Sequence, residues 1–296
     1  MRGAVVLVLA ALTPGPVFAA PVDLPVTLQP GAAWRIDSAM VIEKHSSTGE
    51  SRGTGRSAYG VTLRGDTASR RLEVTDLSLV AGQQPSPIAL EYDVDAALTP
   101  LRITNWDELR RLRNEAVDKS GMPPKMIEDF KATTARISAQ GAAQVLVTEL
   151  PLLAMGQGLD LEVGQSASFK DVRTPPSGRA PTSLSGTFTL VSVDRQDRRA
   201  VVDWRRVTPS QPYSDAARAQ FRELVARTNP KASNELPAMS EESSQACRFD
   251  IDMATGLASR AECDLIGSNM FVNGGGSGIE HQTIHLTITQ TLRGQP

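Results

Sequence analysis

The stretch that decides the fold reads Phe249-Asp250-Ile251-Asp252-Met253-Ala254-Thr255-Gly256-Leu257-Ala258-Ser259-Arg260. Apolar and acidic residues alternate as far as Asp252, which is typical of a half-buried β-strand. An Asp side chain accepts hydrogen bonds from the backbone two residues on, and Gly tolerates positive φ, so both residue types favour turns. The stretch therefore predicts a β-hairpin that turns at Thr255-Gly256.

The only two cysteines of the chain, Cys247 and Cys263, flank this hairpin at equal distances from residue 255. An antiparallel hairpin centred there places them directly opposite each other. Opposed residues have Cβ atoms about 4.5–5.5 Å apart, and a disulfide needs the closer approach of a non-hydrogen-bonded pair. We therefore predict a Cys247–Cys263 disulfide. Metal binding by these two residues is disfavoured, because no other Cys or His stands nearby.

A related phrase occurs earlier, as Tyr92-Asp93-Val94-Asp95-Ala96-Ala97-Leu98-Thr99-Pro100-Leu101-Arg102. Two further phrases match in the same order: residues 28–34 resemble residues 161–169, and the strand pair around Asp66 resembles the pair around Asp194. These matches favour an internal duplication, with a first β-repeat over residues 20–156 and a second over residues 157–296. Chance similarity between β-rich segments is the alternative.

Helical patterns interrupt both repeats. Asn105 is a good N-cap with Glu108 three residues on, and apolar residues then recur at helical spacing from Trp106. A second helix is expected from about Lys125 to Ser138, so that the first repeat carries helices at about residues 105–150. Residues 141–150 fit a helix or a buried strand, and we favour the helix. One inserted helix is expected in the second repeat, at about residues 214–228.

The N-terminus has the three parts of a secretory signal peptide. Arg2 supplies a positive charge, residues 4–12 form an apolar run, and Val17-Phe18-Ala19 fits a cleavage site. We predict a signal peptide over residues 1–19, cleavage near Ala19, and a periplasmic or secreted protein. The mature chain has no apolar run of the roughly 18 residues that a membrane helix needs, so no transmembrane segment is expected.

The charge balance argues against nucleic acid as a partner. The 296 residues carry 31 Lys and Arg against 33 Asp and Glu, for a formal net charge of −2. Proteins that bind nucleic acid usually show a basic excess on at least one face. The predicted partners are an apolar small molecule, a lipid or a component of the cell envelope.

The paired aspartates invite a catalytic interpretation. Asp93 with Asp95, and Asp250 with Asp252, stand two apart, which places both carboxylates about 6.5 Å apart on one face of a strand. Such pairs occur in glycosidases and calcium sites. The structural interpretation is favoured, because the apolar partners take the core face and the second Asp opens a turn.

The three histidines do not predict a metal site. His281 and His285 share a face of the last strand about 13 Å apart, which is too far to bind one metal ion, and His45 belongs to a polar loop. No catalytic residue, cofactor or metal site is predicted. Five aromatic residues are expected in the core first and as the lining of a ligand-sized cavity second. They are Trp34, Trp106, Phe130, Trp204 and Phe221.

The order of elements resembles uncharacterised exported bacterial proteins of the half-barrel, lipoprotein-carrier-like type. The resemblance rests on Pro30-Gly31-Ala32-Ala33-Trp34, on the Tyr92-Asp93-Val94-Asp95 strand and on the helix start at Asn105-Trp106. It covers most of the mature chain through short motifs. It implies an α+β fold of mostly antiparallel curved β-sheets, as two half-barrel-like repeats, with helices packed on the concave face. The second repeat and the C-terminal disulfide depart from a simple carrier.

Two functions follow as hypotheses. The first is a non-enzymatic periplasmic binding or interaction protein for an apolar or lipid-like ligand, with an apolar cavity on the order of several hundred Å³ between sheet and helices. The second is a periplasmic hydrolase with a cleft between the repeats. It requires Asp, Ser or His side chains to converge there, and Asp95, Asp252 and His281 on separate solvent faces would count against it.

Overall fold

A computed structural model of the chain describes residues 22–24, 27–46, 49–65, 69–78, 88–95, 98–146, 149–156, 158–173, 182–212, 219, 240–273 and 276–293. The predicted signal peptide and Phe221 lie outside the described residues, as does the helix predicted at 214–228 apart from residue 219.

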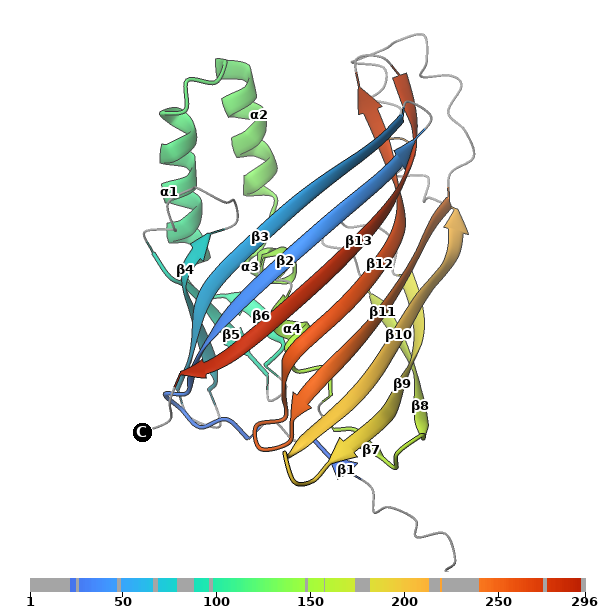
Figure 1. The fold of residues 1–296 in the computed structure, drawn as a ribbon. Helices are drawn as coiled ribbons and strands as arrows, with labels where there is room; N and C mark the ends of the chain where they lie inside the picture. Colours follow the sequence, from blue (N-terminus) through green and yellow to red (C-terminus); the bar gives the residue numbers. More distant parts are fainter. Residues whose placement is uncertain are drawn as a thin grey trace, which may run out of the picture.

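The described residues form one large antiparallel sheet. Its strands are β2 (Ala33–Ser46), β3 (Gly49–Arg64), β4 (Arg71–Ser78), β5 (Leu90–Val94), β6 (Pro100–Ile103), β8 (Ser166–Arg173), β9 (Thr182–Asp194), β10 (Arg199–Pro212), β11 (Ser240–Asp252), β12 (Leu257–Asn273) and β13 (Gly276–Arg293). They pair in the order β6-β5-β4-β3-β2-β13-β12-β11-β10-β9-β8 (Figure 1). The strands of both predicted repeats thus belong to one sheet, joined where β2 pairs with β13. The repeat boundary near residue 156 stays a prediction.

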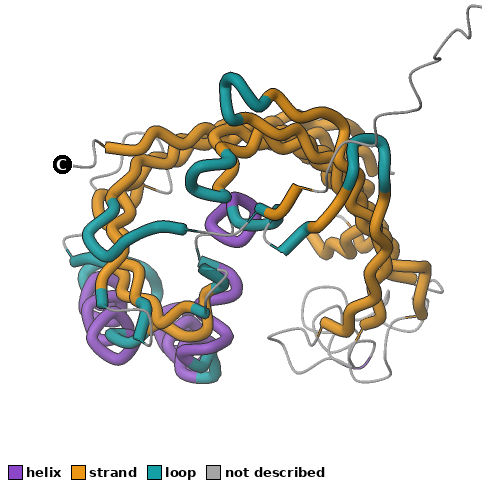
Figure 2. The backbone as a smooth tube through the Cα atoms, turned by 90° about the horizontal axis from the view of Figure 1, so that it is seen from below, coloured by secondary structure: helices purple, strands orange, loops and turns teal. Residues whose placement is uncertain are grey.

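The sheet curves into an open arch when it is viewed end on (Figure 2). Long neighbouring strands twist relative to one another, and the twist accumulates into curvature over many strands. A separate two-stranded sheet pairs β1 (Val22–Asp23) with β7 (Asp160–Leu161). The prediction of a mostly antiparallel, curved sheet is confirmed.

The helices are α1 (Trp106–Asp118), α2 (Pro124–Ala135), α3 (Ala139–Val145) and α4 (Glu149–Leu153). Residues 141–145 and 149–150 are therefore helical, which is the alternative that we favoured. The pair α1–α2 stands at the β4 end of the arch, whereas α4 lies within its curve and contacts β12 (Figures 1 and 2). The helices are consequently not all packed together on the concave face, because α1 and α2 stand apart from α4.

The start of α1 differs from the prediction. Asn105 precedes the helix, but its side chain makes no capping hydrogen bond. Instead, Asn105 Nδ2 donates to the Ala89 carbonyl at 2.8 Å, and Asn105 Oδ1 accepts from the Glu91 N–H at 3.1 Å. The predicted capping box is wrong, because the amide satisfies backbone groups beside and within β5 instead of the first turn of the helix. Asn105 thereby fixes α1 to the sheet.

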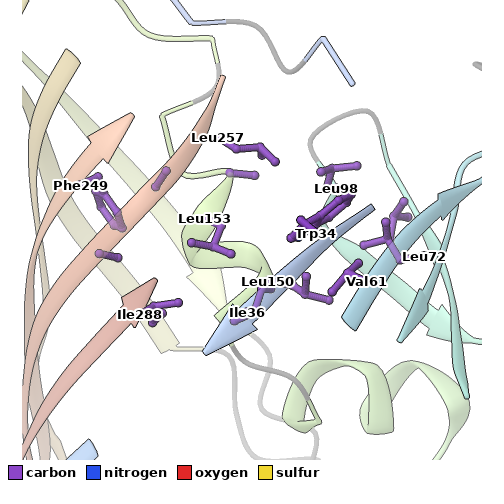
Figure 3. Packing of buried hydrophobic residues seen from close by; sticks show 14 of the residues in the cluster. Trp34, Ile36, Val61, Leu72, Leu98, Leu150, Leu153, Phe249, Leu257 and Ile288 are labelled. Carbon is purple, nitrogen blue, oxygen red and sulfur yellow. The ribbon is translucent and has the colours of Figure 1, made fainter. Parts of the chain in front are cut away.

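The core fills the space between the two arms of the arch. Trp34, Val61 and Leu72 come from β2, β3 and β4. Phe249 and Ile288 come from β11 and β13, and all five belong to the same cluster (Figure 3). Leu150 and Leu153 of α4 point into the same cluster and are only 3% and 2% exposed (Figure 3). The short helix α4 is therefore held by side-chain burial, since five residues are too few for a stable isolated helix.

The hairpin predicted around Thr255-Gly256 is confirmed in outline. Cys247 and Cys263 are register partners with Cα atoms 4.1 Å apart, and they form the predicted disulfide. The turn is longer than predicted and spans residues 253–256, with Gly256 at φ 71°. A β-bulge between Asp250 and Ile251 shifts the register by one residue. This extra residue reconciles the four-residue turn with the direct opposition of the cysteines.

Candidate functional site

The concave face of the sheet continues the core beyond the cover of α4. Trp34 and Ile36 of β2 point into the core (Figure 3), and alternation places Met40 and Ile42 on the same face. Strand register sets Met40 opposite Leu286, and Ile42 opposite Ile284. Ile284 in turn lies opposite Leu265 of β12. We call these five half-buried apolar residues the concave shelf: Met40, Ile42, Leu265, Ile284 and Leu286.

Polar side chains border the shelf on β10 and β11. Leu265 pairs with Gln245, and Gln245 pairs with Arg206. Arg206 Nη2 donates to Gln245 Oε1 at 2.7 Å, and the Arg206 guanidinium lies 5.3 Å from the centroid of the Trp204 ring. A hollow of about 160 Å³ is lined by shelf residues Leu265 and Ile284 together with these polar groups. The concave face therefore changes from apolar to polar over two strands.

An aromatic cluster continues the concave face beside the disulfide. The Trp204 ring stacks on Phe169 with centroids 6.4 Å apart and planes 6° apart, and Phe188 lies 6.3 Å from Trp204. Trp204 is 2% exposed, and its indole N–H has no acceptor among the residues that the structure describes. Phe169 and Phe188 are only half-buried. This part of the sheet thus presents large aromatic surface with one buried donor.

A carboxylate stands where α4 meets the shelf. Glu149 Oε1 accepts hydrogen bonds from Ser38 Oγ at 3.0 Å and Ser57 Oγ at 3.1 Å, and Oε2 accepts from the Tyr59 hydroxyl at 3.4 Å. The two serine hydroxyls are 2.6 Å apart. Ser38 and Tyr59 are buried, so the carboxylate exchanges hydration for three hydroxyl donors. Glu149 is the first residue of α4 and fastens this helix to β2 and β3.

Two buried tyrosines face this carboxylate. Burial raises the pKa of Tyr59 far above its usual value, and the negative charge of Glu149 and its hydrogen bond raise it further. Burial, followed by the charge of Glu149, also raises the pKa of Tyr92. Both phenols stay neutral at any physiological pH. Within the described ranges, the Tyr92 hydroxyl has no hydrogen-bond partner.

The four described members of the predicted aromatic set lie in different parts of the fold. Trp34, Trp106 and Trp204 are buried and belong to the core, as first expected. Phe130 of α2 is half-buried, and the Arg113 guanidinium lies 4.5 Å from the centroid of the Phe130 ring. Phe221 lies outside the described residues. Of the four described residues, Trp204 stands beside the polar border of the shelf, where the Arg206 guanidinium lies over its ring. The ligand cavity that these residues would line stays a prediction.

The paired aspartates have structural roles. Asp93 bonds Arg71 at 3.2 Å and Arg102 at 2.7 Å across three neighbouring strands of the sheet. Asp250 bonds Arg199 at 3.2 Å in the same manner. Asp95 accepts a hydrogen bond from the Thr99 N–H, and Asp252 accepts one from the Ala254 N–H, each at 2.8 Å. Asp252 thus bonds the backbone two residues on, as predicted, whereas Asp95 bonds it four residues on.

One of the three histidines, His45, is placed differently from the prediction. His45 belongs to β2 and not to a loop, and it lies directly opposite His281 of β13. His45 also pairs with Glu50 at 3.1 Å. The pattern of apolar residues does not show how far β2 and β3 extend. It therefore could not predict that His45 lies in a strand opposite His281. His285 pairs with Asp264 at 2.6 Å beside a hollow of about 430 Å³.

No hydrolytic constellation emerges from the predicted residues. Asp95 follows β5, Asp252 ends β11 and His281 lies within β13, so the structure does not bring these three together. Within the described ranges, no group of three His, Cys, Asp or Glu residues is arranged to hold a metal ion. The hydrolase alternative stays a prediction.

Comparison with known proteins does not assign a family. No protein-family model matches the chain, and no curated protein matches its sequence significantly. In the part of the chain that the structure describes, no helix is both long and apolar enough to cross a membrane.

Proposed function

We propose that the protein is a non-enzymatic, exported binding protein that holds an apolar or lipid-like ligand on the concave shelf. The observation that carries the proposal is the continuation of the apolar core past its helical cover. Met40, Ile42, Leu265, Ile284 and Leu286 form adjacent half-buried positions on three neighbouring strands. Contiguous apolar surface of this kind gains about 25 cal/mol for each Å² that a ligand covers.

The half-barrel architecture supports this role. In this proposal the arch and its short helices form an α+β half-barrel, in which α4 closes one end of the concave face and leaves the shelf as the binding wall. The Glu149 hydrogen bonds hold α4 at that position. Ligand sites typically combine such apolar walls with a few fixed polar groups.

The polar border indicates an amphipathic ligand. Arg206 and Gln245 adjoin Leu265, so an acyl or isoprenoid chain on the shelf would place its polar end near the guanidinium. The stacking on Trp204 and the bond to Gln245 keep Arg206 in place. An anionic or strongly polar head group fits this border best.

Export is proposed from two independent features. Residues 1–19 have the order of charge, apolar run and cleavage site of a signal peptide. The Cys247–Cys263 disulfide is typical of proteins that fold in an oxidising compartment. A periplasmic or secreted protein is the localisation that accommodates both features.

The test is native mass spectrometry of protein purified from its own envelope fraction, with two matched variants. Ile284→Glu places a carboxylate on the shelf, whereas Thr283→Glu places it on the opposite face of the same strand. We expect a co-purified apolar ligand in wild type and Thr283→Glu, and at least a tenfold lower occupancy in Ile284→Glu. Ligand-free wild type, or equal occupancy in both variants, would contradict the proposal. The mass of the mature chain reports the cleavage site.

A further inference from the structure

A second hollow lies at the corner where the helical pair α1–α2 leaves the sheet. It measures about 470 Å³ and is separate from the concave shelf. Four arginines from different elements line it: Arg71 of β4, Arg102 of β6, Arg110 of α1, and Arg136 between α2 and α3. Its volume falls within the range of about 300–1,000 Å³ that is usual for small-molecule sites.

The positive charge of this basic corner exceeds its negative charge. Arg71 and Arg102 share one carboxylate, that of Asp93. Arg110 pairs with Asp107, whose side chain is 89% exposed. Such an exposed pair contributes little stability, so a bound anion can replace Asp107 at small cost. Arg136 has no ion-pair or hydrogen-bond partner in the described part of the chain.

The arginines are carried on elements whose positions are fixed. Trp106 forms a wall of the hollow, is 7% exposed, and donates through Nε1 to the Ile137 carbonyl at 3.0 Å. This bond ties the start of α1 to the segment that carries Arg136. Asn105 ties the same end of α1 to β5. Three of the four arginines therefore stand on strands or on α1, and the fourth stands on a segment that the Trp106 bond ties to α1.

We propose that this basic corner binds the oxyanion group of a small ligand, a phosphoryl group above all. A guanidinium donates two parallel hydrogen bonds to a phosphate or carboxylate, and four such groups match the several oxygens of a phosphoryl ester. Ile103 and Ile137 in the lining give the hollow an apolar side that would accept the organic part of the ligand. The chemistry is shared by soluble phosphorylated compounds and by anionic lipid head groups.

The experiment measures binding of inorganic pyrophosphate to the full mature protein by calorimetry at low ionic strength. Two variants, Arg110→Gln and Arg136→Gln, remove one guanidinium each while leaving the Arg71–Asp93–Arg102 group intact. Arg111→Gln is the matched control, because Arg111 is the next residue of α1 and pairs with Glu115 outside the hollow. Arg136→Lys keeps the charge but loses the planar fork. A second arm measures binding to vesicles that contain phosphatidylglycerol.

We expect saturable 1:1 binding that is weakened about tenfold or more in each Gln variant, since a charge-assisted hydrogen bond contributes about 1.5–3 kcal/mol. The affinity of Arg136→Lys should lie between those of wild type and Arg136→Gln. The affinity of Arg111→Gln should lie within about twofold of that of wild type. Vesicle binding that pyrophosphate displaces identifies a lipid head group as the source, and pyrophosphate binding alone identifies a soluble ligand. Absence of saturable binding in both arms, or equal affinity in wild type, Arg110→Gln and Arg136→Gln, would overturn the proposal. Circular dichroism confirms that the variants remain folded.

Discussion

Ser38 Oγ donates to Glu149 Oε1 at 3.0 Å, although 111 residues separate the two in sequence. This contact joins the concave face of β2 to the first residue of α4. Ser57 and Tyr59 bind the same carboxylate, so the cluster closes only when sheet and helix are both in place. The position of α4, and with it the limit of the concave shelf, therefore depends on this carboxylate as well as on the burial of Leu150 and Leu153.

Replacement of Glu149 should destabilise the protein. Glu149→Ala leaves buried hydroxyls without an acceptor, and we expect the free energy of unfolding to fall by about 2–3 kcal/mol. Glu149→Gln keeps one acceptor oxygen and should lose about 1 kcal/mol. Urea denaturation measures both values. Glu128→Ala, on the exposed side of α2, is the control and should change stability by less than about 0.5 kcal/mol. Equal effects of Glu149→Ala and Glu128→Ala would show that the cluster does not hold the helix.

The buried tyrosines predict a loss of stability in alkali. The folded-state pKa values of Tyr59 and Tyr92 are raised, so both phenols stay neutral in the folded chain, whereas in the unfolded chain they ionise near about pH 10. The stabilisation that comes from keeping the two phenols neutral is thus fully present below about pH 10. It is lost as pH rises further, and the free energy of unfolding falls by about 1.4 kcal/mol per pH unit for each residue.

The measurement compares wild type with Tyr59→Phe/Tyr92→Phe between about pH 9 and pH 11, near the ordinary tyrosine pKa of about 10. The double variant should show a shallower decrease of the unfolding free energy. The native-state tyrosinate absorbance at pH 11 should be the same in both proteins, because neither residue ionises while the chain is folded. A lower native absorbance in the variant would mean that at least one of the two tyrosines titrates normally.

Local alternation predicted the strands but not the extent of the sheet. Tyr92 and Val94, like Phe249 and Ile251, are buried as the pattern indicated, because two-residue periodicity directly reports which side chains face the core. The pairing of β2 with β13 could not be predicted in this way. It joins residues more than 200 positions apart, and nothing in either strand alone specifies its partner.

The candidate sites show the same limit. The disulfide was predictable because its two residues share one hairpin, within which register is set by the turn. The concave shelf needs the register of three strands, and the basic corner needs the packing of α3 against β6 and of α1 against α2. The Glu149 cluster had no sequence signal at all, because an isolated Glu and two serines have no distinguishing spacing.

The disulfide should stabilise the hairpin through the unfolded chain. It closes a loop with a sequence separation of 16 residues, and cross-linking a loop of about 15 residues contributes about 3 kcal/mol by restricting the unfolded state. Urea denaturation with and without reductant measures this difference in wild type. Cys247→Ala/Cys263→Ala should resemble the reduced protein and should not respond to reductant. An unchanged urea midpoint after complete reduction of wild type would contradict this account.

Asn105 gives the sharpest test of how α1 is attached. If Asn105 were an ordinary N-cap, Ser or Asp would replace it with little change, since all three residue types are good caps. The amide instead uses a donor for the Ala89 carbonyl and an acceptor for the Glu91 N–H. Asp lacks the donor, and Ser is too short to reach both groups. We therefore expect Asn105→Ser and Asn105→Asp each to lose about 1–2 kcal/mol in urea denaturation.

The same variants link this attachment to the basic corner. Asn105 positions the end of α1 that carries Trp106, and Trp106 holds the segment with Arg136. Pyrophosphate affinity should therefore fall in Asn105→Ser although no arginine is removed, whereas a variant that only loses a cap on an exposed helix would leave it unchanged. Wild-type stability in both Asn105 variants would show that the amide bridge to β5 contributes nothing and that capping alone explains the residue.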